Sequence, residues 1–315
     1  MTEKITQLKE ELSKAVIGQE RMIEGLLIGL LCEGHILIEG VPGLAKTTTI
    51  NALAKALGLD FKRIQFTPDL LPSDIIGAQI YNPKDHSFSV KKGPLFTNLL
   101  LADEINRAPA KVQSALLEVM QEQQVTIGDE TFPLERPFLV MATQNPIEQE
   151  GVYALPEAQL DRFMMKLVVT HNSEAEELEI MRKGATKSFG EVGQVLDREA
   201  LFALQKALET IHIDPELEQY IVSLVSATRK PEKFGLESIA GDIMYGVSPR
   251  ASIDLYKAAR AKAFLRSNDY VTPADIGYVI ADVLRHRIVL SYEARAKGVQ
   301  PDEIIAKIVE TVPVP

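Results

Sequence analysis

Short apolar runs alternate with segments of helical periodicity over the first half of the chain. Such alternation is typical of a parallel sheet whose strands are connected by helices that cover it. The pattern therefore predicts an α/β fold. Five runs have the length of strands: His35–Glu39, Phe61–Phe66, Asn98–Asp103, Phe138–Thr143 and Met164–Val169.

Two helices are predicted between these strands, because apolar residues recur there every three or four positions. The first carries Ile50, Leu53, Ala54 and Leu57 on one face, and Gly58 ends it. The second begins near Pro109. Its apolar face is formed by Val112, Ala115, Leu116, Val119 and Met120.

Two segments interrupt this rhythm and are interpreted as insertions. Ile76–Pro94 is rich in turn residues and too long for a plain connection, so we expect an inserted loop or hairpin there. Gln124–Leu134 alternates apolar and polar residues around Gly128 and Asp129, which predicts a projecting β-hairpin.

The second half of the chain has a different pattern. From about Asp197 we expect helices only, one of which begins at Thr272 and Pro273. Thr186–Gln194 is the segment that most resembles a linker. The sequence therefore predicts a larger domain over residues 1–190 and a smaller all-α domain over residues 191–315.

The composition of the chain disfavours several classes of function. The 315 residues carry 34 basic and 44 acidic side chains, a net charge of −10, which repels nucleic acids and anionic membranes at long range. The single cysteine, Cys32, cannot form an internal disulfide and fits a reducing cytoplasm. We see neither a signal peptide nor an apolar run that spans a bilayer, and the five histidines lack the spacing of a zinc site.

The stretch Ile38–Thr49, IEGVPGLAKTTT, lies between the first predicted strand and helix and is close to the phosphate-binding pattern G-x-x-x-x-G-K-[ST]. Lys46 would reach the β- and γ-phosphates of ATP, and the Thr47 hydroxyl would bind Mg²⁺. Ala45 stands where the pattern has glycine. Since alanine disfavours positive φ, we expect Ala45 in right-handed helical conformation at the start of the helix.

Polar residues follow two of the apolar strands. Asp103 is placed to hold Mg²⁺ and Glu104 to polarise the water that attacks the γ-phosphate, although an acidic pair on a solvated turn is the alternative. Asn145 suits the same water or a phosphate oxygen, and Asn145-Pro146 is otherwise an ordinary turn.

The motifs GVPGLAKT, LLLADEINRAP, ATQNP, LPEAQLDRF and GVSPRA, in this order, resemble the MoxR family of AAA+ ATPases over nearly the whole chain. The resemblance implies an ATPase core with sheet order 5-1-4-3-2 and two insertions, a helical lid and a ring oligomer, often a hexamer. It implies ATP as the nucleotide.

The resemblance also implies roles for individual residues. Asp103 and Glu104 correspond to Walker B and Asn145 to sensor 1. Arg162 corresponds to the arginine finger that reaches a neighbouring subunit's ATP, and Arg250 to sensor 2. The backbone around Ile17, Gly18 and Gln19 would lie beside the adenine. The phosphate loop, or Walker A, and the residue after it comprise Gly40, Val41, Pro42, Gly43, Leu44, Ala45, Lys46, Thr47 and Thr48.

Three functions compete. The first is an ATP hydrolase that remodels a partner protein in a chaperone-like manner; the family suggests a partner with a von Willebrand factor A domain. The second is a slow-hydrolysing nucleotide switch, against which Glu104 argues. The third is a DNA-linked motor, which the acidic charge disfavours although Lys91 and Lys92 lie in the first insertion. For Arg107 a catalytic role and a structural contact at the start of a helix stay open.

Overall fold

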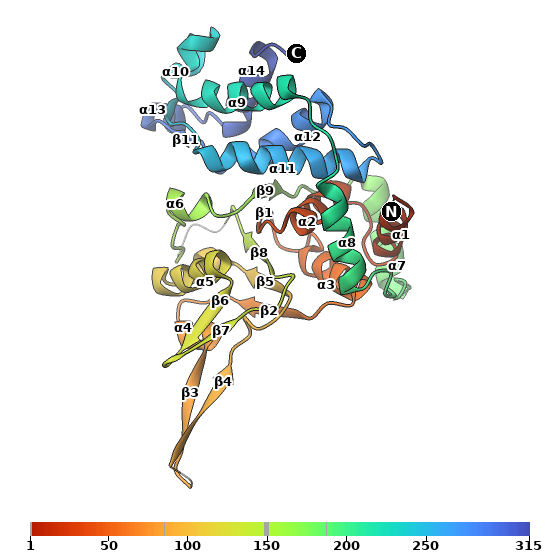
Figure 1. The fold of residues 1–315 in the computed structure, drawn as a ribbon, viewed down its shortest axis with the longest axis vertical. Coiled ribbons are helices and arrows are strands. Elements are labelled where there is room, and N and C mark those ends of the chain that lie inside the picture. Colours follow the sequence, from red (N-terminus) through yellow and green to blue (C-terminus); the bar gives the residue numbers. More distant parts are fainter. Residues whose placement is uncertain (1, 85, 148–150, 187) are drawn as a thin grey trace. The chain divides into compact units, whose positions relative to one another are not determined.

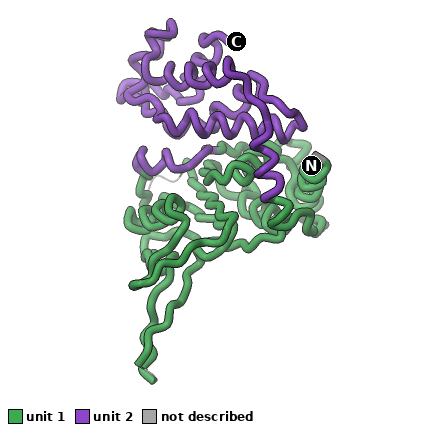
Figure 2. The backbone as a smooth tube through the Cα atoms, viewed as in Figure 1, with its two compact units in different colours: residues 1, 3–155, 167–201 green, residues 2, 156–166, 202–315 purple. Residues whose placement is uncertain are grey.

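The computed structural model describes residues 2–84, 86–147, 151–186 and 188–315. It divides into two compact units (Figure 2). The first comprises residues 3–155 and 167–201, and the second comprises residues 156–166 and 202–315. The predicted division at residue 190 stays a prediction.

A five-stranded sheet forms the centre of the first unit, in the order β2-β5-β8-β1-β9. This is the predicted order 5-1-4-3-2 read from the other edge. In the register, Gln65 lies opposite Asp103 and Ile38 lies opposite Thr143. The strands are β1 (Ile36–Glu39), β2 (Phe61–Gln65), β5 (Leu99–Asp103), β8 (Leu139–Gln144) and β9 (Met165–Val168).

Helices cover this sheet as the periodicity predicts. The apolar stripe of α3 is buried, and Gly58 ends the helix with a φ of 59°. Helix α5 begins directly after Pro109. The helical elements of the first unit are α1 (Thr2–Ser13), α2 (Glu20–Cys32), α3 (Lys46–Leu57), α4 (Pro72–Ile76), the 3₁₀ turn η1 (Ile105–Arg107), α5 (Ala110–Glu122) and α7 (Glu174–Thr186).

Both predicted insertions are hairpins. In the first, β3 (Gly77–Asn82) pairs antiparallel with β4 (Ser87–Lys92), and Figure 1 shows it projecting away from the sheet. In the second, β6 (Gln124–Ile127) pairs with β7 (Glu130–Pro133) around a turn at Gly128 and Asp129.

The rest of the chain is mainly helical, with one difference from the prediction. The short strands β10 (Ile243–Tyr245) and β11 (Val289–Leu290) pair antiparallel, so the expectation of helices only is wrong in this detail. They flank the packed helices α11 and α12, whose contact brings these short segments together. The helical elements are α6 (Glu157–Leu160), α8 (Arg198–Leu208), α9 (Pro215–Arg229), η2 (Pro231–Phe234), α10 (Glu237–Ala240), α11 (Pro249–Leu265), α12 (Pro273–Leu284), α13 (Tyr292–Ala296) and α14 (Pro301–Thr311).

Among the residues described above, no helix is both long and apolar enough to cross a membrane.

The backbone at Ala45 contradicts the sequence prediction. Its φ of 54° and ψ of 17° are left-handed, not right-handed. The helix starts one residue later than expected, at Lys46, and Ala45 is its N-cap, a position where the backbone leaves helical angles. The Ala45 carbonyl accepts bonds from the backbone N–H and the hydroxyl of Thr49, both at 2.9 Å. These bonds maintain a conformation that costs alanine about 1–2 kcal/mol.

Replacement of Ala45 by glycine therefore tests this strain. Glycine adopts positive φ freely, but its unfolded state has more conformational entropy, so we expect the free energy of unfolding to stay level or rise by up to about 1 kcal/mol. Ala115→Gly, in the interior of α5 in the same unit, is the control and should cost about 1 kcal/mol. Denaturant unfolding measures both, and an equal loss in the two variants would contradict a left-handed Ala45.

His35, which precedes β1, is a buried side chain that hydrogen-bonds to the backbone of two other elements. Its Nε2 bonds the Met120 carbonyl at 3.0 Å, and its Nδ1 accepts the Val140 N–H at 3.0 Å. Burial lowers the pKa of His35 to about 4, and the bond to Met120 only partly offsets this. Because Nδ1 must accept a bond, the neutral ring is the form that fits this site.

The pKa of His35 predicts a pH dependence of stability. Its folded pKa lies below its unfolded value, so between these values the unfolded chain binds a proton that the folded chain does not. Its contribution to the free energy of unfolding is present above about pH 6.5 and falls by about 2 kcal/mol by about pH 5. Urea unfolding across this pH range should show a weaker dependence in His35→Gln than in the unmodified protein. His171→Gln, at an exposed histidine, should behave as unmodified; identical curves for all three proteins would refute the role of His35.

Candidate functional site

The loop between β1 and α3 contains two positions, 40 and 43, at which glycine is favoured for different structural reasons. A Cβ on Gly40 would lie 3.0 Å from both the Cβ and the carbonyl oxygen of Val169, so packing against the chain after β9 favours glycine there. Gly43 has a φ of 89°, which other residues rarely adopt, and a Cβ there would meet nothing within 4 Å. Gly43 is therefore required by backbone conformation and leaves open space beside the loop.

A cavity of about 350 Å³ lies where this loop meets the carboxyl ends of β5 and β8. Nine of its lining residues were predicted from the sequence. Six of them belong to the loop and the start of α3, two are the carboxylates Asp103 and Glu104, and one is Asn145, which follows β8. Three more come from β2 and β8. The lining consists of Pro42, Gly43, Ala45, Lys46, Thr47, Thr48, Arg63, Gln65, Asp103, Glu104, Thr143 and Asn145. Gly40, Val41 and Leu44 belong to the same loop but do not line this cavity.

Lys46 supplies the positive charge of the loop. Its Nζ donates to the Gly40 carbonyl at 2.5 Å. Burial lowers the pKa of Lys46, and the charges of Asp103 and Glu104 act in the opposite direction. The first N–H groups of α3 also lack acceptors within the helix, and the positive end of its dipole lies here. The loop therefore suits an anionic ligand such as a phosphate chain.

Asp103 has contacts on both of its oxygens. Thr143 Oγ1 donates to Asp103 Oδ1 at 2.5 Å. Arg63 donates to Asp103 Oδ2 through Nε at 3.1 Å and through Nη2 at 2.6 Å. These contacts hold the carboxylate at the end of β5, one residue before the turn to η1.

Glu104 is positioned by its backbone and by two side chains. Its N–H donates to Thr143 Oγ1 at 2.9 Å, and its φ of 55° is left-handed. Gln65 and Arg107 donate to the same oxygen, Oε2, at 2.6 and 3.0 Å. Oε1 is therefore left to bind other groups, such as a water in the cavity.

Asn145 is the last of the predicted residues that line this cavity, and it is buried, at 7% exposure. Its Oδ1 accepts the backbone N–H of Ile147 at 3.2 Å, which fixes the orientation of the amide. The NH₂ group remains as a donor for a ligand oxygen or a water.

Arg63, Gln65 and Thr143 were not found by sequence reasoning. Arg63 and Gln65 lie two positions apart on β2, so both side chains are on the same face, and β2 pairs with β5. That alternation, combined with the expected strand order, is the signal that could have found them. Arg107, whose role was left open, contacts Glu104.

Gly18 lines a different cavity of the first unit, with a volume of about 430 Å³. Gly18 and Gln19 both have left-handed backbones, with φ of 67° and 62°. Asn172 holds this turn, since its Nδ2 donates to the Ile17 carbonyl at 2.9 Å and its Oδ1 accepts from Gln19 at 2.6 Å. A place for the adenine beside Gly18 and Gln19 stays a prediction.

Arg162 and Arg250 belong to the second unit, whereas the loop and the carboxylates belong to the first. Arg250 is the second residue of α11, and its Nη1 donates to Asp161 at 3.2 Å. Arg162 is the next residue after Asp161 and is half-buried.

The residues present fit a nucleotide phosphate chain with a hard divalent cation. Among the described residues, no three His, Cys, Asp or Glu side chains lie close enough to hold a metal by themselves. Asp103 and the Thr47 hydroxyl carry oxygen atoms, the ligand type that Mg²⁺ prefers, and this ion takes most of its remaining ligands from phosphates and water. Lys46 and the start of α3 supply the complementary positive charge.

Comparisons with known proteins agree with this chemistry. Residues 35–165 match the family model of the ATPase family associated with various cellular activities (AAA), and residues 238–308 match the AAA lid domain. "Chaperone MoxR1" of Mycobacterium tuberculosis is 50% identical over 306 residues, which are 97% of this chain and 81% of that protein. "Protein MoxR" of Paracoccus denitrificans is 36% identical over 96% of this chain and 94% of its own length.

A solved structure is also similar over the whole length of this chain. It is a putative ATPase from Cytophaga hutchinsonii with a TM-score of 0.94 and 53% sequence identity, and the match covers 100% of this chain and 96% of that one. Sequence relatives and structure therefore lead to the same assignment. The chain belongs to the MoxR family of AAA+ ATPases and is an ATP hydrolase.

Proposed function

We propose that this ATPase couples ATP binding and hydrolysis at subunit interfaces to chaperone-like remodelling or activation of a partner protein. The observation that carries the proposal is the cavity of the first unit, where Lys46, Asp103, Glu104 and Asn145 meet around one space. A cation, two carboxylates and a neutral amide in that arrangement can bind a phosphate chain and activate a water beside it.

Several residues of the cavity have specific tasks in this proposal. Lys46 and the N-terminal N–H groups of α3 bind the β- and γ-phosphates. Thr47 and Asp103 would hold the metal. Bound Mg²⁺ would neutralise charge on the phosphate oxygens.

The attacking water is handled by two further residues. Glu104 accepts a bond from the water through Oε1, because Gln65 and Arg107 both occupy Oε2. Asn145 directs the water or a γ-phosphate oxygen through its NH₂ group.

Arg162 and Arg250 extend the proposal to a ring, with a hexamer as the expected assembly. Arg162 would reach the ATP of a neighbouring subunit, and Arg250 would respond to the ATP of its own subunit. A guanidinium placed at the γ-phosphate can raise the rate by 10³-fold or more. Hydrolysis would then depend on assembly.

The chaperone-like role rests on the relative that is named a chaperone, MoxR1. A partner with a von Willebrand factor A domain and a cytoplasmic location belong to the same proposal. A DNA-linked motor is the weaker alternative, because the chain carries a net charge of −10. In addition, Lys92 Nζ lies 4.8 Å from the centroid of the Phe96 ring and 5.1 Å from that of the Phe132 ring. That lysine is engaged by aromatic rings of its own chain.

Glu104→Gln tests the hydrolytic site. The amide cannot take a proton from water, so we expect turnover to fall by 10²-fold or more while ATP binding persists. Steady-state hydrolysis and equilibrium binding of a fluorescent ATP analogue measure the two effects. Glu122→Gln, an exposed residue at the end of α5, is the matched control and should retain full activity. Equal turnover in Glu104→Gln and the unmodified protein would favour a site in which Glu104 takes no part.

Mixing of variants tests the action of Arg162 between subunits. Lys46→Ala removes nucleotide binding and Arg162→Ala removes the finger, so each pure protein should be inactive. A mixture forms interfaces at which an intact loop meets an intact Arg162, and we expect it to regain at least a tenth of the unmodified rate. Size-exclusion chromatography with light scattering would verify mixed assembly. A mixed assembly without activity would contradict action between subunits.

A further inference from the structure

The turn that carries Arg162 is part of the second unit, and its backbone carbonyls accept hydrogen bonds from the residues that follow α12. His286 Nε2 and Arg287 Nη2 both bond the Phe163 carbonyl, at 2.9 and 2.8 Å. Arg287 Nη1 donates to the Met164 carbonyl at 3.3 Å. Arg285 Nη1 donates to the Lys166 carbonyl at 2.7 Å. Three consecutive residues after α12 thus bind two carbonyls of this turn and one of β9, which follows it.

Arg287 is the centre of this arrangement. Its side chain is only 1% exposed. Its Nε donates to Asp161 Oδ1 at 2.9 Å and its Nη2 to Asp254 Oδ2 at 2.5 Å, which joins the turn to α11. Its Nη1 also donates to the Val283 carbonyl of α12 at 2.8 Å. The planar guanidinium has five N–H donors in a fixed geometry, so these bonds determine the position of the turn as a group.

His286 adds a single, well-defined bond. Burial lowers the pKa of His286 well below its ordinary value, and the charge of neighbouring Arg287 lowers it further. The ring is therefore neutral, and its Nε2–H donates to the Phe163 carbonyl. Because Phe163 is fully buried and its carbonyl accepts two bonds, the residue after Arg162 has little freedom.

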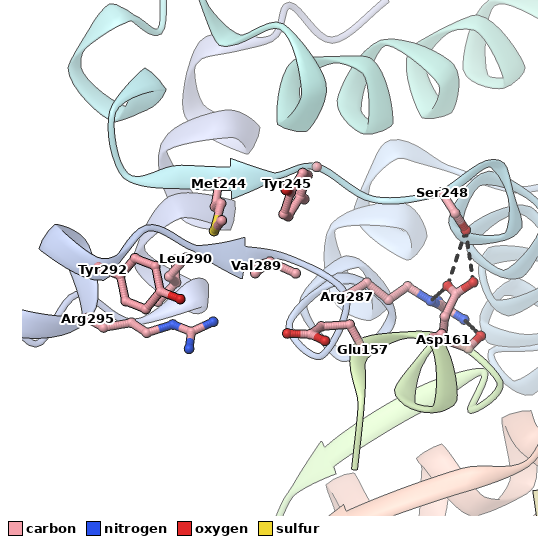
Figure 3. Close-up of a pocket in the computed structure, with 12 residues that line it drawn as sticks. Glu157, Asp161, Met244, Tyr245, Ser248, Arg287, Val289, Leu290, Tyr292 and Arg295 are labelled. Carbon is pink, nitrogen blue, oxygen red and sulfur yellow. Dashed lines mark hydrogen bonds and ion pairs between the residues drawn. The ribbon is translucent and has the colours of Figure 1, made fainter. Parts of the chain in front are cut away.

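Asp161 also binds the other arginine of interest. Ser248 Oγ lies 3.1 and 3.2 Å from the two oxygens of Asp161, and Arg250 Nη1 lies 3.2 Å from Oδ2. Figure 3 shows Arg287 and Ser248 directed at Asp161 from separate elements of this unit. One carboxylate thus connects the start of α11, which carries Arg250, with the residue that precedes Arg162.

We propose that Arg287 is a positioning residue for Arg162. Through its bonds to Asp161 and to the carbonyls of Phe163 and Met164, Arg287 fixes the turn to α12 and to α11, the helix that carries Arg250. Arg162 would then move together with the helices of the second unit. A movement of the lid that draws Arg250 to bound ATP also moves Arg162 at the neighbouring site. The inference rests on the proposed action of Arg162 between subunits.

The mixing experiment can separate this role from a general effect on folding. In a mixture, the Lys46→Ala subunit donates Arg162, and the Arg162→Ala subunit donates the intact loop. We add Arg287→Gln to one partner at a time. Glutamine removes the charge and most of the donors, and Arg287→Lys, which keeps the charge but has only three donors, is tested in the same way.

We expect an asymmetric result. Arg287→Gln in the Lys46→Ala subunit misplaces the only Arg162 available, so the rate of the mixture should fall at least tenfold. The same substitution in the Arg162→Ala subunit affects a turn that has already lost its arginine, so at least half of the rate should remain. Arg266→Gln removes an arginine that pairs with Asp275 in the same unit. Among the described residues, no hydrogen bond or ion pair joins either of them to the turn, so this substitution should be tolerated in either subunit.

The outcomes are distinct. Equal losses in both arrangements, with Gln and with Lys, would show that Arg287 serves folding alone and would overturn the proposal. Equal retention in both arrangements would overturn it as well. Failure of the parent mixture, without any change at Arg287, would instead contradict the action of Arg162 between subunits.

Discussion

The backbone pairing of β8 with β1 on one side and β5 on the other is the constraint on which the site depends. Parallel pairing places the carboxyl ends of all three strands at one edge, where ligands bind in such sheets. The phosphate loop follows β1, Asp103 ends β5, and Asn145 follows β8. Thr143 joins them, because its hydroxyl donates to Asp103 and accepts from the Glu104 N–H. The residues proposed to act on ATP are thus positioned by main-chain hydrogen bonds of a buried sheet.

Local strain accompanies this arrangement. Ala45 and Glu104 both have left-handed backbones, although neither is glycine or asparagine. Each occupies a turn that leaves a strand end or begins a helix beside the cavity. Such conformations persist where surrounding bonds determine them, and they are common where a chain must present groups to a ligand.

The sequence predicted the strands and both hairpins because apolar periodicity and turn residues are local signals, whereas the strand order was expected from the family resemblance. It also predicted most of the cavity lining, since the loop and the residues at strand ends have characteristic chemistry. The backbone conformation of Ala45 was predicted wrongly. The prediction rested on the preference of alanine for negative φ, whereas the position of Ala45 as the N-cap of α3 determines its φ. Arg63 and Gln65 were missed because their importance arises from pairing with β5, far away in the chain. The strands β10 and β11 are too short to leave a pattern.

We propose that ATP binds in the cavity of the first unit and that an arginine from another subunit completes the site. A structure of Glu104→Gln assembled with ATP and Mg²⁺ would test both parts of this proposal. We expect phosphate oxygens within hydrogen-bond distance of Lys46, the metal beside Thr47 and Asp103, and a neighbouring subunit's Arg162 at the γ-phosphate. A nucleotide bound elsewhere, or a γ-phosphate without an arginine from a neighbouring subunit, would contradict it.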